Sequence, residues 1–218
     1  MFNWPVVPIC KQQKLDINSE DLLYNGLFRK CNIYKGGGGY DKFSAIYAKR
    51  FNYIPNPTQF IVQLKGCPLN CWYCYVTEKG INGKPAYIDS DSLINFYVNS
   101  SLEVFHLMGG APALYLEHWK ELSGKVKIFH SDFLLIEKEY KPEWLINLQG
   151  LHAVSLKDFR VNDSLLFKNL DLLIEYNVNF YLTFTGLPIY KESIKKRYGK
   201  NILKDAIYIK IKKYKAIS

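Results

Sequence analysis

Three cysteines lie within eight residues, in the segment Gly66-Cys67-Pro68-Leu69-Asn70-Cys71-Trp72-Tyr73-Cys74. Their C-x3-C-x2-C spacing directly follows a short run rich in apolar and β-branched residues over 60–64. Three thiolates on one loop can bind one metal centre, and soft thiolates select zinc, copper(I) or iron–sulfur clusters. A structural zinc site takes four ligands, and a closed iron–sulfur cluster takes four cysteines. No fourth Cys or His is nearby in the sequence, which leaves a distant fourth ligand or a cluster with one open iron.

The spacing, the aromatic Tyr73 before the third cysteine and the position after the first main strand resemble the radical S-adenosylmethionine superfamily. The resemblance implies a [4Fe–4S] cluster on Cys67, Cys71 and Cys74, with Tyr73 at the cofactor site. It implies that S-adenosylmethionine binds the fourth iron through its amino and carboxylate groups. It also implies reductive cleavage to a 5′-deoxyadenosyl radical, which abstracts hydrogen from a substrate.

A second motif, Gly109-Gly110-Ala111-Pro112, resembles the Gly-Gly-Glu-Pro motif with which the family holds the methionyl amino group. Glycine lets backbone carbonyls approach an ammonium group closely. The chain departs from the family at Ala111, where one carboxylate partner for the cation is missing. Asp132 is the first candidate to replace that carboxylate, and Glu117 is the second.

Polar residues at other expected strand ends complete the candidate site. The resemblance suggests contacts to the ribose or methionyl group from Ser131 and Asp132, and to adenine from Thr185. We expect Lys157 to be the catalytic residue, pairing with the carboxylate of S-adenosylmethionine or with an acidic substrate. Ser155 stands where the glycyl-radical activating enzymes carry the Asp of an Asp-x-Lys pattern. A plain surface or loop role is the alternative for each of these side chains.

The elements that must position these residues alternate along the chain. The sequence predicts strands at 60–64, 104–108, 126–129, 153–156, 180–184 and 207–211. Helices are predicted from Ser90, Pro112, Pro142 and Asp163, and over 191–203. Such alternation indicates an α/β fold with a parallel sheet, and the length favours an open partial (β/α)6 barrel. Catalytic groups should then lie at the carboxyl ends of the strands.

Residues 1–58 do not follow this alternation, and we interpret them as an irregular N-terminal extension that could cover the substrate site. The main domain is then expected over residues 59–218. The run Gly36–Gly39 lacks the Gly-Lys-Ser/Thr ending of a phosphate-binding loop and predicts a flexible connector. Cys10 and Cys31 are expected to be small buried hydrophobes, with a second metal or a redox-active thiol as the alternative.

Positive charge is concentrated at the end of the chain. The 218 residues carry a formal net charge of +9, and residues 190–218 hold ten basic side chains against Glu192 and Asp205. This segment can bind an acidic protein, an anionic substrate or nucleic acid, or form a solvated face. Within the family resemblance, an acidic low-potential electron donor such as flavodoxin or ferredoxin is the expected partner, and nucleic acid is less favoured.

The composition argues against a membrane, secreted or disulfide-rich protein. With 48% hydrophobic residues, no membrane-length apolar run and no secretory start, the sequence predicts a cytoplasmic globular chain without a membrane partner. Five cysteines, an odd number, argue against a disulfide framework. In size and architecture the chain is similar to glycyl-radical activating enzymes and 7-carboxy-7-deazaguanine synthases. The first hypothesis is therefore a radical S-adenosylmethionine enzyme acting on a small molecule or a partner's glycyl residue. The alternative is a non-catalytic zinc or iron–sulfur module that binds nucleic acid through its basic tail.

Overall fold

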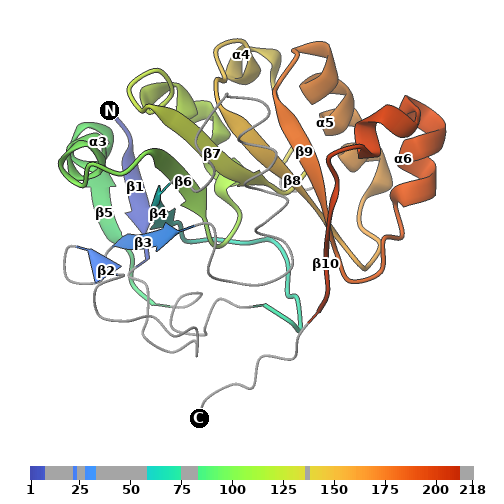
Figure 1. Cartoon of the computed structure of the whole chain (residues 1–218), viewed down its shortest axis with the longest axis horizontal. Helices are drawn as coiled ribbons and strands as arrows, with labels where there is room; N and C mark the ends of the chain where they lie inside the picture. Colours follow the sequence, from blue (N-terminus) through green and yellow to red (C-terminus); the bar gives the residue numbers. More distant parts are fainter. Residues whose placement is uncertain (8–21, 24–27, 33–57, 75–82, 136–137, 212–218) are drawn as a thin grey trace.

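The computed structural model describes residues 1–7, 22–23, 28–32, 58–74, 83–135 and 138–211, which form a mixed α/β fold (Figure 1). Its main sheet has eight strands in the order β10-β9-β8-β7-β6-β4-β3-β2. Six of them run parallel, which confirms the predicted parallel sheet. These are β4 (Thr58–Gln63), β6 (Val104–Met108), β7 (Ile128–Phe133), β8 (Leu151–Lys157), β9 (Phe180–Thr185) and β10 (Ile207–Ile209).

The helices lie along one side of this sheet, as Figure 1 shows. They are α3 (Ser90–Asn99), the 3₁₀ helix η2 (Pro112–Glu121), α4 (Pro142–Leu145), α5 (Asp163–Glu175), α6 (Lys191–Tyr198) and the 3₁₀ helix η3 (Lys200–Leu203). The helix predicted over 191–203 is divided at Gly199, whose φ of 78° does not continue a helix. Within the described ranges, no helix has the length and apolar character that crossing a membrane requires.

Ser90 and Asp163, from which two helices are predicted, could each cap its helix, but in both helices the capping residue lies one position earlier. Asp89, not Ser90, caps α3, because its carboxylate accepts a hydrogen bond from the backbone N–H of Ser92 at 2.9 Å. Asn162, not Asp163, caps α5 by the same kind of bond. In both places two cap-forming residues stand side by side, so composition alone cannot choose between them.

The strands bury both of their faces, which explains their nearly continuous apolar sequences. One face packs against the helices in the main hydrophobic core, which includes Phe105, Phe129, Val154 and Leu182. The opposite face carries a smaller apolar cluster of Val104, Ile128, Leu151, Ala153, Tyr181 and Ile207. Since side chains alternate along a strand, Ser155 and Lys157 follow Ala153 on this second face of β8.

The N-terminal extension is less irregular than predicted. It contributes β1 (Asn3–Val6), β2 (Leu22–Leu23) and β3 (Phe28–Asn32). β3 pairs antiparallel with β4 and so extends the main sheet, while β1 pairs antiparallel with β5 (Ala86–Asp89). These strands are short and paired with distant residues, so no local periodicity marks them. Gly36–Gly39 and Cys10 lie outside the described residues.

The start of the chain is bound to the helical layer through Glu121 at the end of η2. The Glu121 carboxylate accepts hydrogen bonds from the Ser90 hydroxyl at 2.6 Å and from the backbone N–H of Phe2 at 2.9 Å. Ser90 in turn accepts from the indole of Trp4 at 2.9 Å. Burial acts to raise the pKa of Glu121, but these hydrogen bonds outweigh it and hold the pKa below its ordinary value.

Replacing Glu121 by glutamine is therefore expected to lower the free energy of unfolding by about 1–2 kcal/mol at pH 7, because two charge-assisted hydrogen bonds are weakened. A lowered folded-state pKa gives stability that is present above the unfolded-state pKa and lost as the pH falls through the folded-state value. Denaturant unfolding of wild type and Glu121→Gln should differ at pH 7, and the difference should disappear as the pH falls through the folded-state pKa of Glu121. Glu175→Gln, at the exposed end of α5, is the control. A difference that stays the same as the pH is lowered would contradict the role of the charge.

Candidate functional site

The cysteine loop, residues 66–74, follows β4 and carries three cysteines that are not in disulfides. Cys67 and Cys74 are exposed, and Cys71 is half-buried. The loop turns where the backbone N–H of Cys74 donates to the carbonyl of Cys71 at 2.9 Å. Two aromatic residues occupy this turn in opposite environments: 66% of Trp72 is exposed to solvent, but only 7% of Tyr73. The turn therefore fixes Tyr73 against the protein and leaves the thiols accessible.

The start of the loop packs on the Gly-Gly turn that follows β6. The N–H of Ala111 donates to the carbonyl of Gly66 at 2.6 Å, and the Tyr115 hydroxyl donates to the carbonyl of Lys65 at 2.7 Å. Gly110 has a φ of +52°, and a Cβ built on it would lie 2.2 Å from the Gly66 oxygen. Glycine is thus required at this position by both conformation and contact. The two motifs predicted to share one site are in direct contact.

The third position of the second motif faces the interior. Ala111 is fully buried and Pro112 is buried, so a glutamate side chain here would require the packing to change. Glu117, one candidate for the missing carboxylate, forms an ion pair with Lys138. Burial acts to raise the pKa of Glu117, but Lys138 holds it below the ordinary value. The Asp132 side chain lies outside the described part of the structure, so its predicted role stays a prediction.

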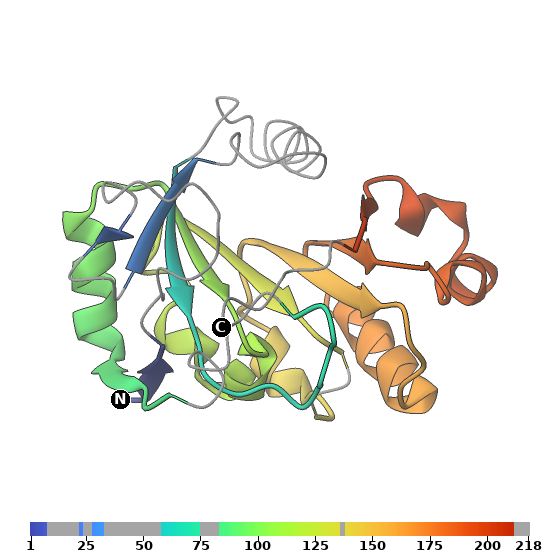
Figure 2. The same ribbon diagram turned by 90° about the horizontal axis from the view of Figure 1, so that it is seen from below.

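The carboxyl end of β8 meets the cysteine loop. Figure 2 shows this loop running on from β4 below the other strands. The Tyr73 hydroxyl donates to the Asp158 carboxylate at 2.9 Å. Burial raises the pKa of the Cys71 thiol, and the nearby Lys157 ammonium partly offsets this. The structure therefore brings the end of β8, which carries the predicted Lys157, to the cysteine loop.

Asp158 is a site residue that the sequence reasoning missed. Burial and its hydrogen bond to Asp158 raise the pKa of Tyr73 above the ordinary tyrosine value, so the phenol stays protonated as a donor. Asp158 also contacts Gly186, where a built Cβ would lie 2.5 Å from the carboxylate. The sequence feature that could have identified Asp158 is its position as an acid directly after Lys157, at the end of an expected strand.

The ends of the neighbouring strands β8 and β9 hold the predicted cofactor-site residues Ser155 and Thr185. Thr185 pairs with Lys157, and Ser155 pairs with Thr183, across the parallel β8–β9 ladder. Thr185 is half-buried, whereas Thr183 is buried and its hydroxyl donates to the carbonyl of Val154 at 3.3 Å. Thr185 is therefore the threonine of this strand that stands level with Lys157.

Ser131 lies on the helix-facing side of β7, away from the second face of the sheet. It is fully buried, and its hydroxyl lies 2.9 Å from Nδ1 of the equally buried His152. Since side chains alternate, Ser131 and Asp132 cannot face the same side of one strand. A ligand contact from Ser131 would have to replace this buried hydrogen bond.

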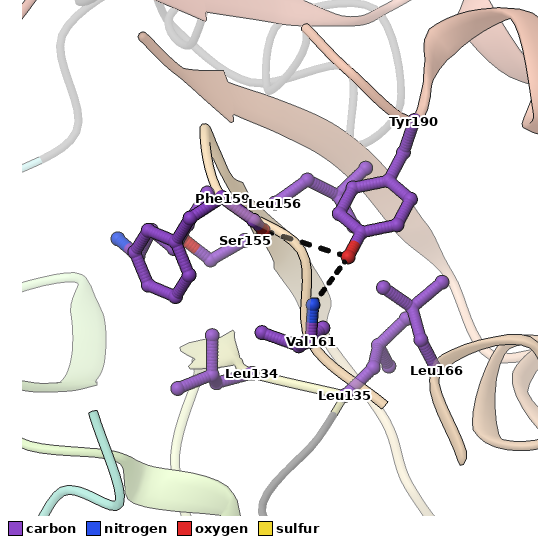
Figure 3. Close-up of a pocket in the computed structure, with 9 residues that line it drawn as sticks. Leu134, Leu135, Ser155, Leu156, Phe159, Val161, Leu166 and Tyr190 are labelled. Carbon is purple, nitrogen blue, oxygen red and sulfur yellow. Dashed lines mark hydrogen bonds between the residues drawn. The ribbon is translucent and has the colours of Figure 1, made fainter. Parts of the chain in front are cut away.

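Ser155 and Lys157 also line a small pocket, drawn in Figure 3. Its other walls are mainly apolar and include Leu134, Phe159 and Leu166. Tyr190 closes one side, with its hydroxyl accepting from the N–H of Val161 at 2.9 Å. The pocket places apolar surface beside the Lys157 cation.

The donor set fits an iron–sulfur cluster on chemical grounds. Three cysteine thiols on one loop, none of them in a disulfide, are the soft ligands that such a cluster takes, and two of them are exposed. In the described residues, no three His, Cys, Asp or Glu side chains are grouped to hold one metal ion. Thiolates that bind different irons of a cluster need not converge on a single point, as zinc ligands must.

Solved structures share this fold. Native anSMEcpe with bound AdoMet aligns with a TM-score of 0.52 and 16% identity over 67% of this chain and 49% of its own. A histidine-tagged form of anSMEcpe with bound AdoMet aligns with a TM-score of 0.50 and 18% identity over 67% and 47%. The chain thus spans about half the length of these proteins. The chain therefore shares its fold with a protein whose structure was solved with AdoMet bound.

A structure of QueE from Escherichia coli covers 72% of this chain and 87% of its own. Its TM-score of 0.38 and identity of 14% are too low to support an argument. No protein-family model matches the sequence. No curated protein matches it either.

Proposed function

We propose that this chain is a radical S-adenosylmethionine enzyme built on an open partial (β/α)6 barrel. The observation that carries the proposal is the meeting of three elements. The three-cysteine loop packs on the Gly109-Gly110 turn and touches the carboxyl end of β8 through Tyr73. When bound, a reduced [4Fe–4S] cluster supplies the electron that cleaves S-adenosylmethionine, yielding a radical that removes hydrogen from a substrate.

The chain's own residues divide the remaining work. Cys67, Cys71 and Cys74 hold the cluster. The backbone of Gly109 and Gly110 holds the methionyl ammonium without a side chain at Ala111. Lys157 binds the carboxylate of S-adenosylmethionine or of an acidic substrate. Ser155 and Thr185, at the ends of β8 and β9, bind the nucleoside part of S-adenosylmethionine. Residues 1–58 are proposed to cover the substrate, which is a small molecule or a partner's glycyl residue.

The direct test is anaerobic reconstitution of the full chain with iron and sulfide. Iron and sulfide are then quantified, and 5′-deoxyadenosine is measured by chromatography after addition of dithionite and S-adenosylmethionine. We expect about four irons per chain and product above that of zinc-loaded protein. A colourless protein that retains one zinc and forms no product would contradict the proposal and favour the binding-module alternative.

We also propose an acidic low-potential electron donor as partner, in the cytoplasm, where thiols remain reduced. The described part of the basic segment, from α6 to β10, carries exposed Lys196, Lys200, Lys204 and Lys210. Such a surface steers an acidic protein, and the association weakens as salt is added. Binding of flavodoxin that is insensitive to salt would contradict this partner.

Lys157 should control affinity for S-adenosylmethionine by pairing with its carboxylate. Removing a charged hydrogen-bond donor costs about 1.5–3 kcal/mol, so Lys157→Ala should raise the half-saturating concentration of S-adenosylmethionine roughly 10- to 100-fold. Lys157→Arg should recover part of the affinity because the charge remains. The matched control is Lys168→Ala, whose ammonium pairs with Glu139 on the exposed side of α5. An unchanged half-saturation with Lys157→Ala would remove this residue from the cofactor site.

A further inference from the structure

The cysteine loop is held to the sheet at its far end by one side-chain pair. Tyr73 is buried, and its hydroxyl donates to the carboxylate of Asp158 at 2.9 Å. Tyr73 lies between Cys71 and Cys74, whose own backbone bond closes the turn. The phenol therefore connects this turn directly to the end of β8, 85 residues further along the chain.

Asp158 is itself fixed in place. It follows the last residue of β8, and β8 pairs with β9 up to Lys157 and Thr185. Gly186 follows β9 with a φ of +80°, and its N–H donates to the carbonyl of Ile209 at 2.9 Å. A Cβ at Gly186 would lie 2.5 Å from the Asp158 carboxylate, so this glycine makes room for the acid.

Charge adds a second relation between Asp158 and the thiols. The Asp158 carboxylate lies 2.9 Å from the hydroxyl of Tyr73, the residue directly before Cys74. Its negative charge is therefore placed against the loop that carries the thiols. A negative charge beside a cluster disfavours addition of an electron.

We propose that Asp158 is a positioning residue that anchors the cysteine loop through Tyr73 and, by its charge, lowers the reduction potential of the bound cluster. The second part rests on the proposed function, whereas the first concerns the loop alone. The anchor holds Cys71 and Cys74 in the arrangement that receives the cluster, so less conformational freedom is lost when the cluster binds.

The anchor is tested in the full chain without a cluster, by hydrogen exchange at the Cys74 amide. Asp158→Ala and Tyr73→Phe should each accelerate exchange roughly 10- to 100-fold, because a hydrogen bond to a charged group is lost. The double variant should add little, since both changes remove the same bond. Asp158→Asn keeps an oxygen acceptor and should exchange within about fivefold of wild type. Asp91→Ala, on exposed α3, is the control for loss of an acid.

The charge effect is tested on reconstituted protein by iron content and by potentiometric titration followed by electron paramagnetic resonance. Asp158→Asn should bind as much iron as wild type but with a higher midpoint potential, while Asp158→Ala should bind less iron. Additive exchange effects in the double variant, or wild-type exchange in Asp158→Ala, would overturn the anchor. An unshifted potential in Asp158→Asn would overturn the charge role. If wild type takes up no iron, the proposed function and the charge role both fail, and the exchange data still decide the anchor.

Discussion

Replacing Cys71 by alanine is expected to abolish formation of 5′-deoxyadenosine while the chain remains folded. Cys71 is the middle one of the three proposed ligands, and two thiolates would leave a second iron without a protein ligand. The side chain is half-buried on a loop, so its loss removes few apolar contacts, and the free energy of unfolding should change by at most about 1 kcal/mol. Anaerobic reconstitution, iron analysis and chromatography of the nucleoside check the first part, and denaturant unfolding checks the second.

Cys31→Ala serves as the matched control for loss of a cysteine. Its backbone lies in β3, paired in register with Gln59, on a strand that precedes the motif. We expect it to retain full iron content and product. If Cys71→Ala still formed product at the wild-type rate, the C-x3-C-x2-C loop would not be the cluster site, and the argument from the motif would fail.

The sequence predicted the parallel core of the fold because each of its units is local. A strand such as Val104–Met108 is a short apolar run that ends at Gly109, and the helix over Asp163–Glu175 shows a clear apolar stripe. Both elements appear where they were predicted. The strands β1, β3 and β5 were not predicted, because they are defined by pairing with distant segments and not by a local sequence pattern.

The candidate site was predictable where a motif holds its residues together in sequence. The cysteines and the Gly-Gly turn are two such motifs, and the backbone bond from Ala111 to Gly66 joins them. Asp158 was not predictable in this way, because its role depends on a hydrogen bond with Tyr73, which lies 85 residues earlier in the sequence. Ser131 shows the reverse case: a polar residue near a strand end has its partner, His152, inside the core. Which side of a strand a residue faces depends on register, and register depends on the whole sheet.

The contact between the two motifs also makes Gly110 a position that is highly sensitive to substitution. Gly110→Ala would place a methyl group 2.2 Å from the carbonyl oxygen of Gly66 and 2.8 Å from that of Leu64, and both obstacles are backbone. A left-handed conformation costs an alanine about 1–2 kcal/mol, and overpacking adds about 1–3 kcal/mol. Denaturant unfolding should therefore show a loss of about 2–5 kcal/mol.

Gly124→Ala is the control that separates the cost of the left-handed backbone conformation from the cost of the steric clash. Gly124 has a φ of +81°, yet a Cβ there would meet nothing within 4 Å, so only the conformational cost of about 1–2 kcal/mol should appear. The functional difference should be larger than the difference in stability. In Gly110→Ala the Gly66 carbonyl must move, and the loop that carries Cys67 moves with it, so both cluster loading and S-adenosylmethionine cleavage should fall. Gly124→Ala should retain both. If the two variants lost equal stability and equal activity, the close approach of the Gly-Gly turn to the cysteine loop would have no role in holding the site together.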